Sequence, residues 1–142
     1  AEKMMRVRKV YGLAVVTALI FGLMKTGLIL SMPEAIVRLF NSESPELIKT
    51  AGKGLMIYFS AMPFVAVNVV TVVFLQSIEK SLPALLITLC RTIGLIMIGL
   101  MILPAWFGIT GVWLIVPFAE LFTMGIAVSY MKFRKVFKRI EA

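Results

Sequence analysis

Long apolar stretches, separated by short polar ones, make up most of the chain. Four of them reach the roughly 20 residues that a helix needs to cross the hydrocarbon of a bilayer. We place them at about residues 10–30, 54–75, 83–103 and 111–130. Because 61% of the 142 residues are hydrophobic, the chain has more apolar side chain than one soluble core could bury. The pattern predicts one all-α integral membrane domain over residues 1–142.

Most of the basic residues lie outside the apolar stretches, and they gather at the two ends of the chain, which carries a net charge of +8. Lys80 lies in the connection between the second and third spans. By the positive-inside rule, both termini and that connection should face the cytoplasm, with residues 131–142 as a basic amphipathic tail at the cell membrane. This distribution argues against nucleic-acid binding. The chain does not begin with methionine or a signal peptide, and we expect it to be part of a longer protein.

Between the first two spans, the polar residues predict helix starts. Ser31 and Glu34 have the spacing of a capping box, and Glu34 and Arg38 could pair one helical turn apart on a short amphipathic segment that lies at the membrane interface. Ser44 followed by Pro45 predicts the N-cap and first residue of the next helix.

The second span is apolar but interrupted by a proline and by polar residues. A proline in a spanning helix leaves one carbonyl without its N–H partner, so Pro63 predicts a kinked helix whose freed carbonyl is paired by a neighbour. Asn68 and Thr71 share a sector of that helix with Lys53 and Ser60. Such a polar face either lines a cavity or holds two helices together through hydrogen bonds.

Three ionisable residues interrupt the other spans: Lys25, Arg91 and Glu120. Charges inside a membrane are costly and are functional candidates by default. Glu120 is placed to bind a cation or a proton, or else to form a structural pair with Arg91 or Lys25. For Arg91 and Lys25, a structural salt bridge or snorkelling to the interface are the alternatives.

The remaining composition points away from catalysis. Met62 is one of ten methionines, whose flexible side chains suit either a wall for varied apolar ligands or simple gap filling. Cys90 is the single cysteine, so no intrachain disulfide can form, and the chain has no histidine. We find no paired acids, metal-ligand set or phosphate-binding loop, and we predict neither an enzyme nor a bound metal or organic cofactor.

Several local features, taken in order, resemble the last four helices of the multidrug and toxic compound extrusion (MATE) family. They are residues 40–46 (FNSESPE), Pro63-Phe64, residues 76–80 (QSIEK), residues 83–85 (PAL) before Arg91, residues 108–113 (GITGVW), and residues 117–120 (PFAE). The resemblance covers nearly the whole chain. It departs from the family at Glu79, where members usually have glycine, and in the lack of a carboxylate between Pro63 and Gln76.

This resemblance implies a twelve-helix exporter of two six-helix lobes, which expels small cationic amphipathic compounds in exchange for Na⁺ or H⁺. The chain would then be part of the second lobe, completed by N-terminal helices that it lacks. Asn68, Thr71, Met62 and Pro63 would line or bend the substrate cavity, and Glu120 would bind the coupling ion or brace the lobe.

Two alternatives stay open at this point. A small four-helix exporter working as a homodimer has the right number of spans, but such proteins depend on an acidic residue in the first span, where this chain has Lys25. A membrane subunit that assembles a complex without transporting anything is the third possibility.

Overall fold

The structure is a computed structural model that describes residues 2–40 and 44–133. Over those residues, every element is a helix. The elements are α1 (Glu2–Ser31), α2 (Pro33–Arg38), α3 (Pro45–Phe59), α4 (Met62–Ser77), α5 (Ser81–Leu89), the π-helical segment η1 (Cys90–Leu95), α6 (Ile96–Phe107) and α7 (Ile109–Phe133). The predicted all-α fold class is confirmed.

Four helical stretches are long and apolar enough to cross a membrane, and each contains one of the predicted spans. The first lies in α1 and the fourth in α7. The second combines α3 with α4, and the third combines α5, η1 and α6. The chain is therefore a multi-pass membrane protein.

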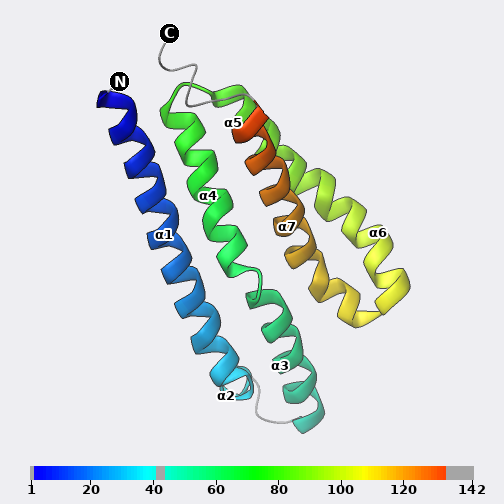
Figure 1. The fold of residues 1–142 in the computed structure, drawn as a ribbon. Coiled ribbons are helices and arrows are strands. Elements are labelled where there is room, and N and C mark those ends of the chain that lie inside the picture. The colour runs from blue at the N-terminus through cyan, green and yellow to red at the C-terminus, as the bar shows by residue number, and fades with distance from the viewer. Residues whose placement is uncertain (1, 41–43, 134–142) are drawn as a thin grey trace.

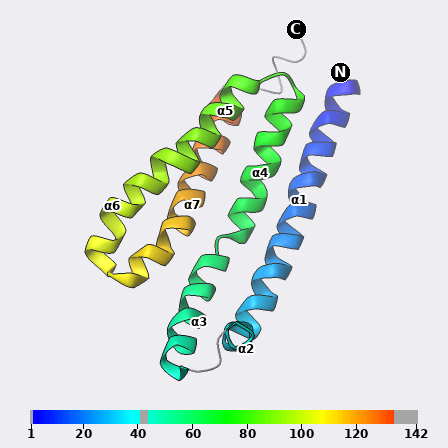
Figure 2. The same cartoon turned by 180° about the vertical axis from the view of Figure 1, so that it is seen from behind.

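The spans run up and down, so that their ends alternate between the two sides of the bundle. The start of α1, the α4–α5 turn and the end of α7 lie at one end, and α2 and the α6–α7 connection lie toward the other (Figure 1; Figure 2 shows the reverse side). This relative arrangement is the one that the basic residues predict. That the first of these ends faces the cytoplasm stays a prediction.

Helix α4 occupies the middle of the bundle, with α1 on one side and α7 on the other (Figure 1). At the α4–α5 end, Leu75, Ala84, Ile87 and Ala127 form a buried apolar cluster that joins α4, α5 and α7. The outer faces remain apolar and open: Leu28 on α1 is 69% exposed and Met101 on α6 is 77% exposed. Faces of this kind contact lipid or other helices in a membrane.

The second span is broken at Ser60 and Ala61, where two turn residues separate α3 from α4. The expected single kinked helix is therefore two helices, and the expected polar sector does not run through it. Lys53 and Ser60 are exposed on or just after α3, whereas Asn68 and Thr71 are buried on α4. Helical spacing predicts which side chains share a face only within a continuous helix, so it does not relate the residues of α3 to those of α4 across the break.

Two carbonyls at the break have hydroxyl partners. Pro63 has no N–H to offer the carbonyl of Phe59, and Thr26 Oγ1 on α1 donates to that oxygen at 2.9 Å. Ser60 Oγ donates to the carbonyl of Ile57 at 2.6 Å. Gly22 lets α1 approach the break closely enough for the Thr26–Phe59 contact, since a Cβ at Gly22 would lie 3.0 Å from Pro63 Cα. The predicted repair of the freed carbonyl by a neighbouring helix is thus present.

The predicted helix starts have mixed outcomes. Ser44 caps α3 as expected, accepting from the Leu47 N–H at 3.4 Å, with Pro45 at the first position. The capping box at Ser31 is wrong. Helix α1 extends through Ser31, whose hydroxyl donates back to the Leu28 carbonyl at 2.7 Å, and Met32 is the N-cap of α2.

The α4–α5 turn is tight although it has no glycine. Glu79 adopts a left-handed conformation with φ 60°. The Lys80 N–H donates to the Leu75 carbonyl at 2.8 Å, and the Glu79 N–H donates to the Gln76 carbonyl at 3.1 Å. These two bonds form a Schellman motif, which glycine normally completes because other residues are strained there.

Replacing Glu79 should therefore reveal that strain. We expect Glu79→Gly to raise the free energy of unfolding by about 0.5–1 kcal/mol, measured by denaturant titration in mixed micelles. Glu79→Ala is the matched control, because it removes the charge and keeps the Cβ. An equal gain in both variants would assign the effect to charge and contradict the strain argument.

The Thr26 hydroxyl should contribute most to the free energy of unfolding when Pro63 is present. We expect Thr26→Val to lower the free energy of unfolding by about 1–2 kcal/mol, because it leaves the Phe59 carbonyl unpaired. In a Pro63→Ala background the restored N–H can serve that carbonyl, so the same substitution should cost less than half as much in a double-mutant cycle. Equal costs in both backgrounds would show that Thr26 does not compensate for the proline.

Candidate functional site

A buried asparagine on α4 reaches the fourth span. Asn68 is 1% exposed, and its Nδ2 donates to Glu120 Oε2 at 2.8 Å and to the Glu120 backbone carbonyl at 2.9 Å. Because Nδ2 is the donor in both bonds, the amide orientation is fixed by two acceptors on α7. An asparagine at this depth would be unfavourable in hydrocarbon, and here α7 supplies its partners.

The same carboxylate also contacts the third span. Arg91 Nη1 lies 3.4 Å from Glu120 Oε1, so the two carboxylate oxygens face two different partners. Glu120 is 8% exposed, whereas the Arg91 side chain keeps 23% of its surface exposed. Three spans thus meet at one charge, and we call Asn68, Arg91 and Glu120 the central cluster.

The backbone is irregular where Arg91 joins this cluster. Residues 90–95 form the π-helical segment η1 between α5 and α6. A π-helical turn accommodates an extra residue and rotates the side chains that follow it, and such turns occur often at functional sites. The third span therefore presents its arginine from an irregular segment of helix.

One polar atom of the central cluster has no partner. Among the described residues, Asn68 Oδ1 is the buried side-chain atom that lacks a hydrogen bond. An unpaired buried acceptor is rare in folded proteins, and it often marks a functional group or a site for water or an ion. Asn68 also contacts the Glu120 carboxylate. Amide and carboxylate oxygens are the ligands that a small hard cation prefers.

Thr71 uses its hydroxyl for contacts within the protein. Thr71 Oγ1 donates to the Val67 carbonyl at 2.8 Å and lies 2.9 Å from the Tyr11 hydroxyl on α1. Since the single Thr71 proton is engaged, Tyr11 is the donor. Tyr11 also packs on Phe74, with ring centroids 4.5 Å apart. The sequence alone did not predict this contact, because periodicity does not reveal which helix lies opposite.

The other predicted site residues lie apart from the central cluster. Met62 and Pro63 begin α4 and pack against Gly22 at the helix break. Lys25 is exposed on the outer face of α1, beside Phe21, Met24 and Leu28. Of the two predicted partners for Glu120, the structure therefore selects Arg91.

The chain belongs to the MatE family, because the model of that family matches residues 1–103, well over half of the chain. This confirms the family that the sequence features predict, the transporters that export drugs and other toxic compounds. Neither the curated proteins nor the solved structures gave a match. The matched stretch includes Asn68 and Arg91 and ends before Glu120.

Removing the Asn68 amide should destabilise the bundle. Asn68→Leu leaves the buried Glu120 carboxylate without its shortest hydrogen bond, and we expect a loss of about 2–3 kcal/mol in the free energy of unfolding. Gln76→Leu, which removes an exposed amide near the end of the same helix, should change it by less than about 0.5 kcal/mol. Equal effects would mean that the Asn68–Glu120 contact contributes little to stability.

Proposed function

We propose that this chain forms the last four helices of a twelve-helix exporter, which expels small cationic amphipathic compounds in exchange for Na⁺ or H⁺. Family membership supports an exporter. The antiport mechanism, the ion and the substrate class are the added steps, and the central cluster is the observation that carries them.

The carboxylate of Glu120 is the proposed ion-binding group. A coupling cation that approaches Glu120 competes with the Arg91 guanidinium for Oε1, since both are held by the same negative charge. Asn68 Oδ1, unpaired within the described residues, would supply a neutral oxygen ligand to Na⁺. A proton would act differently, by neutralising the carboxylate. Both ions would weaken the Arg91–Glu120 pair.

Loosening that pair would free the third span to move against the fourth. Arg91 lies in the π-helical segment η1, which can rewind, and α4 meets α3 at a two-residue break. Alternating access in secondary transporters depends on such broken helices near a central ion site. We infer that the break at Ser60–Ala61 is the hinge. Asn68, Thr71, Met62 and Pro63 would then line the path that opens beside α4.

A purely structural salt bridge is the competing interpretation of Glu120. To separate the two, we would measure ethidium efflux in proteoliposomes that carry the full-length transporter under an imposed Na⁺ or H⁺ gradient. Glu120→Gln keeps an oxygen acceptor for Asn68 but removes the charge, and we expect at least a tenfold loss of gradient-driven efflux, the usual scale for losing an essential charged group. The gradient that drives wild-type efflux identifies the coupling ion.

Two controls make this result interpretable. Glu46→Gln removes an exposed carboxylate from the first turn of α3 and should leave efflux unchanged. The thermal unfolding midpoint of Glu120→Gln reports whether the variant folds. Efflux close to wild type in a folded Glu120→Gln protein would overturn the coupling role and leave the pair structural.

The length of the native polypeptide tests the proposed place of this chain in the exporter. An antibody raised against residues 131–142 should detect, in membranes of the source cell, a band about three times the 15.8 kDa of this chain, as twelve spans of ~20 residues with their loops require. A band near 15.8 kDa would contradict the twelve-helix proposal and favour a small dimeric exporter or an assembly subunit.

A further inference from the structure

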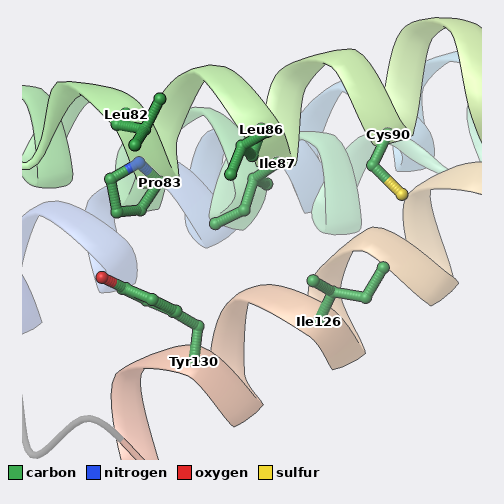
Figure 3. Close-up of a pocket in the computed structure, with 7 residues that line it drawn as sticks. All are labelled: Leu82, Pro83, Leu86, Ile87, Cys90, Ile126 and Tyr130. Atoms are coloured by element: carbon green, nitrogen blue, oxygen red, sulfur yellow. The ribbon is translucent and has the colours of Figure 1, made fainter.

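An apolar groove runs between the third and fourth spans, and none of its lining residues belongs to the central cluster. It has a volume of about 400 Å³, within the range of roughly 300–1,000 Å³ that is typical of ligand pockets. We call it the α5–α7 groove. It is lined by Leu82, Pro83, Leu86, Ile87 and Cys90 on α5 and η1, and by Ile126 and Tyr130 on α7 (Figure 3).

The groove is elongated along the helices. Its lining residues on α5 and η1 follow one helical face from Leu82 to Cys90, which spans about 12 Å at 1.5 Å per residue. Ile126 and Tyr130 lie one turn apart on the opposite wall. Tyr130 lies near the end formed by Leu82 and Pro83, and Cys90 lies near Ile126 at the other end (Figure 3). A narrow slot parallel to spanning helices has the direction of a lipid acyl chain.

The chemistry of the wall favours an apolar occupant. None of the seven lining residues carries a charge, so the groove has no anionic group to pair with a cation. Its polar groups are the Tyr130 hydroxyl and the Cys90 thiol. A tyrosine at the mouth of an apolar slot is typical of the level at which lipid headgroups begin.

Positive charge lies at that mouth. Lys80 is the N-cap residue of α5, two residues before Leu82, and the start of α5 adds the positive end of a helix dipole. Glu79 is the acidic residue in the same turn, and its side chain is exposed. A basic residue beside a groove between spanning helices favours anionic headgroups over zwitterionic ones.

We propose that the α5–α7 groove binds one anionic phospholipid, with an acyl chain along Leu86 toward Cys90 and the headgroup at Lys80. This inference is separate from the proposed coupling role of Glu120. The site would attach the third span to the membrane surface on the side of the α4–α5 turn. Its inner end lies at η1, next to the residue that pairs with Glu120.

Photoreactive lipids test the occupant directly. We would reconstitute the full-length transporter in phosphatidylcholine vesicles with a trace of a diazirine-bearing phospholipid, whose headgroup is either phosphatidylglycerol or phosphatidylcholine on identical chains. Crosslinked residues are mapped by mass spectrometry. We expect the phosphatidylglycerol probe to label Leu86, Cys90 and Ile126 about fivefold more than the phosphatidylcholine probe, the factor for ~1 kcal/mol per basic residue.

Charge variants sharpen the result. Lys80→Gln should reduce phosphatidylglycerol labelling of the groove toward the phosphatidylcholine level, whereas Glu79→Gln should increase it. Lys49→Gln, an exposed lysine on α3 at the other end of the bundle, is the matched control and should change nothing. An unchanged phosphatidylcholine pattern verifies that each variant is folded.

Two outcomes would overturn the proposal. Equal labelling of the groove by both probes would mean that it contacts bulk lipid without headgroup selection. No labelling of Cys90 or Ile126 by either probe, with labelling elsewhere on the spans, would mean that a protein segment or another ligand covers the groove.

Discussion

The buried carboxylate of Glu120 is the group that fixes how three of the four spans sit together. An ionised group inside a membrane requires both charge compensation and hydrogen bonds, and no single helix offers both. Asn68 on α4 supplies the hydrogen bonds and Arg91 on the third span supplies the charge. Only one relative rotation of these helices brings both side chains to the same carboxylate. The cluster therefore sets the packing of α4, η1 and α7, and any ion that competes for Glu120 acts on all three.

The same requirement explains how α1 is held against the helix break. A proline in hydrocarbon leaves a carbonyl that water cannot reach, and Thr26 on α1 pairs with it across a contact that Gly22 keeps close. Tyr11 adds a second hydrogen bond to α4, at Thr71. The apolar faces between these points give little preference for one helix over another in lipid. Polar contacts thus specify the neighbours of α4.

The fold class, the four spans and the polar candidates could be read from the sequence, because hydrocarbon penalises each polar residue strongly enough to make it visible. Periodicity gives the face of each helix but not the rotation of one helix against another, so it could not choose between Arg91 and Lys25 for Glu120, nor find Tyr11 opposite Thr71. Local signals also compete. Ser31 satisfies the capping-box pattern, yet α1 continues through it, and Glu79 takes a conformation that its side chain disfavours because the Schellman bonds hold it there.

We propose that Glu120 exchanges its arginine partner for the coupling ion, and ion-induced difference infrared spectroscopy tests this exchange without requiring transport. The full-length transporter in lipid is perfused alternately with and without Na⁺, and then at two pH values. If the coupling ion displaces Arg91 from Glu120, a carboxyl or carboxylate band responds to one of these ions in the wild type and is missing in Glu120→Gln. Identical difference spectra for the wild type and a folded Glu120→Gln protein would contradict it, because the responding group would then lie elsewhere.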